Sequence, residues 1–480
     1  MKQEAITPVD ESEEFQVSEM FVSRTDKKGI IQSGNEVFVR ISGYTFQELL
    51  KRPHNVIRHT DMPKSVFKLF WSRLKADLPT FAYVKNRSKS GKHYWVLAAA
   101  FPNPDGYFSI RLKPTSEILK KIIPLYSAVL QLEKEKGMEE GEQYLLKQLE
   151  LMGFSDYDKF MLFAMQEELM AKEKQTSKES ILDTANSVGR SQYKKLKDLR
   201  DYAVLANTEI QKTGQQISGL QTRNKGFIEY AQKVKNSCVR LQYLASNMSI
   251  TAHKFGKEGG SLAVVAASYQ AATQRVQKGL DAFCSSLEKV ITELDRSLVD
   301  VLCLRVQIEM ISFEIDEAER AIFTNEQNRN FPIEKRIEDI GILLHIVHAY
   351  FMSSNENLVG YYKKIQGTQS LCRDISKILL NIDLIRTGGL IEGSRTDKVE
   401  KSFQPFMEDL SKIITEVQDP IEQISSFLQS LDTGYDAAMT FTRRTEFFLS
   451  KAAHLHSVFL GKKMDEPNSP TIQIVPNQAA

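Results

Sequence analysis

Residues 89–112 read KSGKHYWVLAAAFPNPDGYFSIRL, two runs of apolar and aromatic residues separated by Asn-Pro and Asp-Gly. Such runs on either side of turn residues predict short strands joined by a hairpin. Residues 33–45, SGNEVFVRISGYT, show the same mixture and are also interpreted as strand and turn. Between these two stretches, residues 45–50 and 63–77 have helical spacing. Strand, short helices and further strands predict a small α+β domain at residues 15–117.

The middle of the chain is helical by composition and by period. No proline occurs between Pro124 and Pro332, and the segment is rich in Leu, Ala, Glu, Lys and Gln. From Leu196 to Met248, apolar or small residues recur in alternating steps of three and four, the heptad pattern of a coiled coil. Within this seam, Asn224 is a candidate for fixing the register of the helices.

A second heptad seam runs from Val276 to Val301, after a segment rich in glycine. Two such arms around a glycine-bearing turn predict an antiparallel helical hairpin at residues 176–308, with its tip near residues 245–262. An isolated hairpin would expose its apolar seams to water. We therefore expect homodimerisation into a four-helix bundle.

The remaining segments flank this hairpin. Residues 118–175 are predicted to be a helical linker. Residues 309–462 are predicted to form an additional bundle of shorter helices, because prolines and a Gly388-Gly389 pair interrupt the helical pattern. Residues 1–14 carry little pattern, and residues 463–480 contain three prolines, so both ends are predicted to be disordered.

Composition limits the classes of function. The 480 residues include 63 basic and 61 acidic ones, a net charge of +2 that gives no support to nucleic-acid binding. The four cysteines are far apart and form no CxxC pair, which is typical of reduced cysteines in a cytosolic protein. The chain starts without the blocks of a signal peptide, and its most apolar later stretch, residues 341–352, is short. We expect a cytoplasmic protein with no membrane span.

Several motifs lie close together in the first quarter of the chain: SGYT with QEL, PHNVIRH with DMPK, KNR, HYWV and GYFSIR. Together they closely resemble the PAS domain of bacterial aerotaxis receptors. The resemblance implies a noncovalently bound FAD whose redox state is the signal. Carried over by position, it also implies a set of flavin-pocket residues: Asn35, Arg58, His59, Asp61, Trp71, Asn86 and, near the sheet face, Trp95.

The residue types in this set suit a flavin. Its ring needs an apolar or aromatic slot with a few polar partners at one edge, and nearby charges set its reduction potential. Arg58 and Asp61 could provide such charges. Thr60 stands where the family usually has proline, and the hairpin at residues 101–108 is shorter than its family counterpart. The alternative interpretation is that residues 58–61 only close a helix and that Trp71 only fills the core.

Residues 244–270, LASNMSITAHKFGKEGGSLAVVAASYQ, resemble the hairpin tip of methyl-accepting chemotaxis proteins. That resemblance implies docking of the chemotaxis histidine kinase and its adaptor at these positions: Asn247, Ile250, Thr251, Lys254, Lys257 and Glu258. The acidic and arginine positions of the family are occupied here by other residues, Lys257 and Gly260 among them, which alters the surface a partner would recognise. A generic helical relay or scaffold is the alternative interpretation.

Other chemistry has little support in the sequence. The chain contains no GxxxxGK[ST], HExxH or GxSxG motif, so we expect no enzyme. His345 and His348 lie one helical turn apart, but no third ligand is nearby, and they are interpreted as ordinary helix residues rather than metal ligands. The same interpretation applies to His454 and His456. Glu168, with its neighbour Glu167, is interpreted as part of a charge pair on a solvated helix.

These features together predict a signal transducer. Redox state or oxygen-linked electron flow would change the PAS-bound flavin and shift the sheet against the helix that begins near Ile118. The shift would pass into a dimeric helical bundle as a small change of packing. The alternative function is a cofactor-free PAS and coiled-coil scaffold for another partner. An enzyme in the C-terminal helices is a third alternative that no motif supports.

Overall fold

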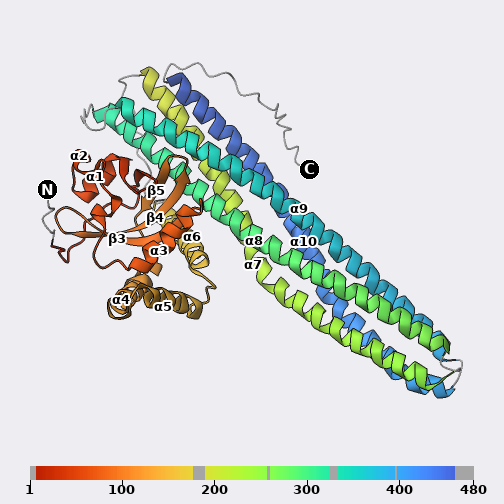
Figure 1. Cartoon of the computed structure of the whole chain (residues 1–480). Coiled ribbons are helices and arrows are strands. Elements are labelled where there is room, and N and C mark those ends of the chain that lie inside the picture. The colour runs from red at the N-terminus through yellow and green to blue at the C-terminus, as the bar shows by residue number, and fades with distance from the viewer. Residues whose placement is uncertain (1–6, 177–189, 257–259, 325–332, 395–396, 460–480) are drawn as a thin grey trace. The chain divides into compact units, whose positions relative to one another are not determined.

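The computed structural model describes residues 7–176, 190–256, 260–324, 333–394 and 397–459 (Figure 1). The chain divides into two compact units. The first unit comprises residues 1–208, 302–350 and 445–480, and the second comprises residues 209–301 and 351–444.

A five-stranded antiparallel sheet forms the centre of the N-terminal domain, which lies in the first unit (Figure 1). In sheet order the strands are β2 (Ile31–Gly34), β1 (Phe21–Asp26), β5 (Gly106–Leu112), β4 (His93–Asn103) and β3 (Thr80–Arg87). Short helices connect β2 to β3: α1 (Glu36–Ser42), α2 (Phe46–Leu49), the 3-10 helix η1 (His54–Ile57) and α3 (Lys64–Lys75). The predicted α+β domain is confirmed.

The hairpin between β4 and β5 forms where the sequence predicts it, with Asn103 paired to Gly106. Gly106 has a φ of 156°, and a Cβ atom at this position would lie 1.9 Å from the backbone oxygen of Thr25 in β1. Only glycine fits such a close approach of two strands.

The strand predicted within residues 33–45 is wrong from Glu36 onward, because this segment is helix α1. Asn35 caps the helix through its Oδ1 atom, which accepts a hydrogen bond from the Phe38 backbone at 3.2 Å. Gly43 ends the helix with a φ of 70°. An Asn cap and a left-handed glycine are strong helix-end signals, and here they outweigh the strand preference of the residues between them.

The two faces of the sheet contact different elements. Residues paired directly across antiparallel strands share a face, and neighbours along a strand point to opposite faces. The inner face is defined here by Phe21, Ser23, Asn86, Tyr94 and Arg111. It packs against Phe38 of α1 and His54 of η1.

The outer face is defined by Tyr83, Trp95 and Phe101. Helices α4 (Ile118–Lys136), α5 (Met138–Leu151) and α6 (Tyr157–Thr176) follow β5 and occupy the residues for which a helical linker is predicted. Trp95 contacts Tyr126 of α4 with ring centroids 6.3 Å apart, and Tyr83 donates a hydrogen bond to Glu168 of α6 at 2.7 Å. The outer face is therefore covered by helices of the same chain.

Four long helices follow: α7 (Arg190–Lys254), α8 (Gly260–Thr324), α9 (Ile333–Gly393) and α10 (Asp397–Phe459). The predicted seam of α7 is buried along its described length, with Ala206, Val234 and Leu241 each no more than 1% exposed. The seam of α8 is buried as well. The side chain of Asn224 lies outside the described residues. The boundary predicted at residue 308 falls inside α8.

The prediction of shorter helices after residue 309 is wrong. Helices α9 and α10 contain 61 and 63 residues, and Pro405 and Pro420 lie inside α10. A proline inside a helix costs about 3 kcal/mol because it removes a hydrogen bond and crowds the preceding turn. Heptad-spaced residues such as Leu410, Val417 and Leu428 are almost fully buried in α10, and their packing outweighs that cost.

In the second unit, the α9/α10 hairpin covers the α7/α8 hairpin. Ser286 of α8 and Thr368 of α9 share a hydrogen bond of 2.7 Å, and the rings of Tyr362 and Tyr435 stack at 4.0 Å. Phe403 of α10 contacts Phe255, the residue after the end of α7. The reason for expecting a homodimer, an uncovered seam, is thus removed, because the chain supplies the second hairpin itself.

Among the described residues, no helix is both long enough and apolar enough to cross a membrane.

Candidate functional site

The segment from Arg58 to Met62 lies along β3, the strand at one edge of the sheet. Arg58 forms an antiparallel bridge with Asn86 of β3, and the His59 backbone donates to the Lys85 oxygen at 3.3 Å. The Lys85 backbone in turn donates to the sulfur of Met62 at 3.2 Å. This segment therefore protects an exposed strand edge as well as bringing charged side chains to it.

Arg58 points toward α3. Its guanidinium donates to the Met62 oxygen at 2.9 Å and lies 4.1 Å from the ring centre of Phe67. Burial lowers its pKa, while the charge of Glu133 on α4 opposes that change. Glu133 also accepts hydrogen bonds from the backbone of Lys64 and Ser65, at 2.7 and 2.8 Å, and so caps α3. This arrangement links residues 58–62 to α3 and α4.

His59 is 3% exposed, and its Nδ1 atom accepts from the Asp61 backbone at 3.1 Å. Burial, with the charge of Lys85, lowers the pKa of His59 to about 4, so the ring is neutral at physiological pH. Burial alone would raise the pKa of Asp61, but the 2.8 Å hydrogen bond and the charge of Lys85 outweigh it and lower that pKa. The negative charge of Asp61 is thus balanced by the positive charge of Lys85.

The structure brings together Arg58, His59, Asp61 and Asn86, whereas Trp71 contacts the inner face at the far end of β4, and Asn35 and Trp95 lie apart from both. Trp95 lies on the outer face. Trp71 of α3 contacts Tyr107 of β5, with ring centroids 5.4 Å apart. Tyr107 pairs with Pro102 near the end of β4, whereas Asn86 pairs with Tyr94 near its start. Trp71 and Asn86 therefore lie at opposite ends of β4.

Asn35 lies between the start of α1 and the long helix α8. Its Nδ2 atom donates to the Met20 oxygen at 3.1 Å and to Glu314 of α8 at 2.8 Å. The next residue, Glu36, forms an ion pair with Arg336 of α9. Burial raises the pKa of Glu314 to about 7, despite the hydrogen bond from Asn35. Asn35 therefore connects α1 and the start of β1 to the long helix α8.

Two inner-face residues, Ser23 and Arg111, form a polar cluster with His54 of η1 that the sequence analysis does not predict. The guanidinium of Arg111 donates to the Ser23 hydroxyl at 3.0 Å and to His54 Nε2 at 2.6 Å. Burial, followed by the charge of Arg111, lowers the pKa of His54 well below its usual value, so the imidazole is neutral. Burial lowers the pKa of Arg111 to about 10, which leaves it protonated. The feature of the sequence that could have indicated this cluster is an arginine within the otherwise largely apolar strand GYFSIRL, residues 106–112.

Two further inner-face groups are buried without a partner. The Nδ2 atom of Asn86 and the hydroxyl of Tyr94 have no hydrogen-bond partner within the described residues. Asn86 and Tyr94 are 3% and 2% exposed, and they pair across β3 and β4. Leaving a polar group buried and unpaired costs about 1–3 kcal/mol. This face therefore has unused donor capacity beside aromatic rings, which suits a planar ligand with polar edges.

The predicted partner-binding tip lies at the end of α7. Asn247, Ile250 and Lys254 are exposed, and Thr251 is half-buried. Lys257 and Glu258 lie outside the described residues. The described part of the tip is accessible at Asn247, Ile250 and Lys254, but these residues do not identify a partner.

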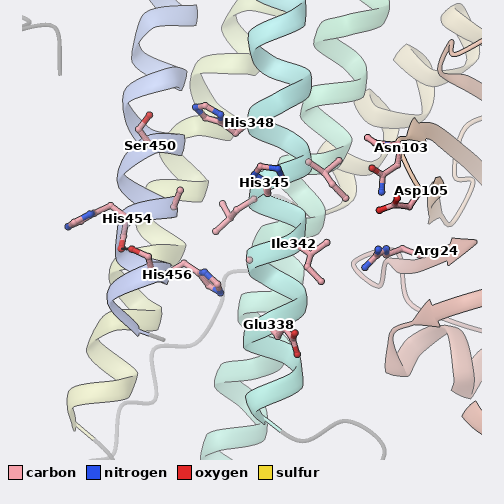
Figure 2. Close-up of a pocket in the computed structure, with 16 residues that line it drawn as sticks. Arg24, Asn103, Asp105, Glu338, Ile342, His345, His348, Ser450, His454 and His456 are labelled. Atoms are coloured by element: carbon pink, nitrogen blue, oxygen red, sulfur yellow. Dashed lines mark hydrogen bonds between the residues drawn. The ribbon is translucent and has the colours of Figure 1, made fainter. Parts of the chain in front are cut away.

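A separate pocket of about 800 Å³ in the first unit is lined by β1, the β4–β5 turn, α9 and α10 (Figure 2). Its wall includes His345, His348, His454 and His456 (Figure 2). His456 is buried, with its Nε2 atom 2.6 Å from the Ile337 oxygen, and so has a structural partner. In the part of the chain that the structure describes, no group of three or more His, Cys, Asp or Glu residues could hold a metal ion.

Comparisons with known proteins define the class of the N-terminal domain. Residues 32–107 match the sequence profile of the PAS fold, and this is a PAS domain. Over 113 residues the chain is 46% identical to the aerotaxis receptor of Escherichia coli (strain K12). That match covers 22% of this chain and 22% of the receptor, so most of each protein lies outside it.

Two solved structures of light-oxygen-voltage domains are also similar to part of the chain. One was studied with a flavin analogue, and the other comes from a fungal photoreceptor. They are 18% and 17% identical, cover 24% and 22% of this chain and 87% and 79% of their own, and have TM-scores of 0.20 and 0.18.

Proposed function

We propose that the PAS domain binds a flavin, FAD, noncovalently on its inner face and that the redox state of this flavin is the signal. The unpaired donors of Asn86 and Tyr94 carry the proposal, because a flavin ring offers acceptors along one edge and an apolar surface for aromatic contacts. The similarity of this segment to the aerotaxis receptor adds support. When bound, the flavin would supply reversible electron exchange.

The residues along β3 have a second role in the proposal. The backbone of Arg58 forms a bridge with Asn86, the Arg58 guanidinium lies against Met62 and Phe67, and Asp61 forms an ion pair with Lys85. Charges at this edge influence the potential of a nearby ring. The neutral ring of His59 adds no charge of its own at physiological pH. Arg58, His59 and Asp61 therefore stay among the proposed binding residues, together with Asn86.

The signal can leave the domain through the outer face. Glu168 of α6 accepts from the backbone of Thr115 and Ser116, at 2.6 and 2.8 Å, just before α4 begins at Ile118. It also accepts from Tyr83 of β3. A movement of the sheet would therefore reach α4 and α6 together, which supports the relay expected from the sequence.

The contact of Asn35 with Glu314, and the ion pair of Glu36 with Arg336, offer a second route directly to α8 and α9. Both pairs involve residues at the start of α1, so a shift of α1 would change its contacts with α8 and α9 at the same time. Such a relay requires only that the two redox states differ in their preferred packing.

We further propose that the relay bundle is formed within one chain and that the exposed tip meets the chemotaxis histidine kinase and its adaptor, in the cytoplasm. The α9/α10 hairpin supports the first part, since it occupies the place of a second subunit. Light scattering of the purified protein tests it: a single-chain mass at micromolar concentration is expected. A stable homodimer would mean that another surface of the chain pairs.

The flavin proposal is tested by the visible spectrum of protein purified without added cofactor. Flavin bands that bleach with dithionite are expected, and Asn86→Ala should lose at least tenfold in FAD affinity. Asn103→Ala is the matched control, because Asn103 ends β4 away from the Asn86–Tyr94 pair. A spectrum without flavin bands that added FAD leaves unchanged would contradict the proposal and favour the cofactor-free scaffold.

A further inference from the structure

Arg111 is a buried cation for which the described residues supply no ion-pair partner. It is 5% exposed, and its two hydrogen-bond acceptors, the Ser23 hydroxyl and the neutral imidazole of His54, carry no charge. The rings of Phe21 and Phe38 lie 5.8 and 5.6 Å from the guanidinium carbon. A buried charge without a counter-charge is costly, and proteins normally pair it.

The cluster is arranged so that its positive charge is not cancelled. Arginine can only donate hydrogen bonds, so the His54 Nε2 atom that faces it must act as acceptor. His54 then carries its proton on Nδ1, and the whole cluster keeps one positive charge. Aromatic rings contact the guanidinium through their faces, which helps to retain it in the interior but does not neutralise it.

The charge lies on the same face as the unpaired polar groups. Arg111 pairs with Ala98 of β4, four residues along the strand from Tyr94, so both side chains point inward. Phe21 contacts Tyr94 with ring centroids 6.1 Å apart and also lies beside Arg111. One side of the domain thus combines a cation, two free polar groups and aromatic surface.

We infer that Arg111 is the group that receives the negative charge of the bound ligand, and that it tunes the reduction potential of the flavin. This inference rests on the proposed function. Uptake of two electrons from a donor and one proton from solvent leaves a flavin ring with one negative charge. A guanidinium in a low-dielectric interior stabilises that charge, whereas no atom or proton moves to or from Arg111.

The inference predicts opposite effects of one substitution on stability and on binding. Arg111→Met removes the charge with little change of volume. Without flavin, the variant should be at least as stable toward urea as the unsubstituted protein, because the uncompensated charge is gone. With flavin, its affinity for the reduced form should fall at least tenfold more than for the oxidised form, which lowers the midpoint potential by about 30 mV.

Two further variants keep the test decisive if Arg111→Met misfolds. Arg111→Gln keeps hydrogen-bonding capacity without charge and should show the same shift of potential, whereas Arg111→Lys should stay close to the unsubstituted value. Lys113→Met, next to the end of β5, is the control, since Lys113 pairs with Glu14 at the surface. Protein that binds no flavin would overturn the proposed function and this inference together. Protein that binds flavin, with unchanged potentials in Arg111→Met and Arg111→Gln, would overturn the inference alone.

Discussion

Tyr83 and Tyr94 lie on neighbouring strands of one sheet, and burial raises the pKa of both hydroxyls above the usual range. On the outer face, the hydroxyl of Tyr83 donates to Glu168 at 2.7 Å. On the inner face, the hydroxyl of Tyr94 has no partner in the described protein. Two otherwise similar residues thus differ in whether the chain itself completes their hydrogen bonds. The difference separates a face whose buried hydroxyl is hydrogen-bonded by a helix of the same chain from a face whose buried hydroxyl has no such acceptor among the described residues.

The largest loss of stability should come from removing the hydrogen bonds that Glu168 accepts at the outer face. Glu168→Ala removes the acceptor of hydrogen bonds from Tyr83, Thr115 and Ser116. Because this would leave the buried Tyr83 hydroxyl and two half-buried backbone N–H groups without their acceptor, we expect a loss of about 3–5 kcal/mol in the free energy of unfolding, measured with urea. Glu167→Ala is the matched control and should change the stability by less than about 0.5 kcal/mol. Equal losses in both variants would contradict the role given to Glu168.

A smaller effect should appear at Glu314, which accepts one hydrogen bond from Asn35 and faces Arg336, Asp339 and Glu317. Burial raises its pKa from 4.5 to about 7, so the folded state binds a proton more tightly than the unfolded state. Its contribution to stability is complete below pH 4.5 and is lost as the pH rises to 7. Between these limits the loss is about 3 kcal/mol.

Glu314→Gln keeps an acceptor for Asn35 but cannot ionise. The variant and the unsubstituted protein should therefore have similar stability near pH 4.5, and the variant should be more stable at pH 8. Urea unfolding at several pH values measures the difference, with Glu288→Gln on the exposed side of α8 as control. A difference that does not vary with pH would show that folding leaves the pKa of Glu314 unshifted.

The smallest changes in stability are expected when the hydroxyl of Tyr83 or of Tyr94 is removed. In protein without ligand, Tyr83→Phe should lose about 1–2 kcal/mol, since Glu168 loses a hydrogen bond. Tyr94→Phe should instead be neutral or stabilising by up to about 1 kcal/mol, because an unpaired hydroxyl leaves the interior. Thermal unfolding of the two variants side by side measures this. Equal destabilisation would mean that Tyr94 has a partner in solution.

The parts of the fold with strong local signals could be predicted from the sequence. The β4–β5 hairpin follows from its turn residues, and the α7 seam follows from its heptad steps. The second hairpin was missed because Pro405 and Pro420 were interpreted as helix ends, whereas burial of the surrounding seam keeps α10 continuous. Helix α1 was missed because its apolar residues resemble a strand, although Asn35 and Gly43 mark both of its ends.

The candidate site could be predicted only in part. Motif resemblance brings in Arg58, His59, Asp61 and Asn86, which the structure places together. It does not reveal that Arg111 is buried, because burial of an arginine depends on which strands pair and which face they present. The interpretation of Glu168 as a solvated charge was wrong for the same reason: it is 2% exposed, against the sheet.

The four-helix bundle of the second unit has a consequence for how the protein responds to its own abundance. A bundle assembled from two separate subunits dissociates as it is diluted, and its stability depends on protein concentration. Here the two hairpins belong to one polypeptide, and their effective concentration is on the order of millimolar, whatever the number of molecules in the cell. Assembly of the bundle should therefore be as complete at a few copies as at thousands.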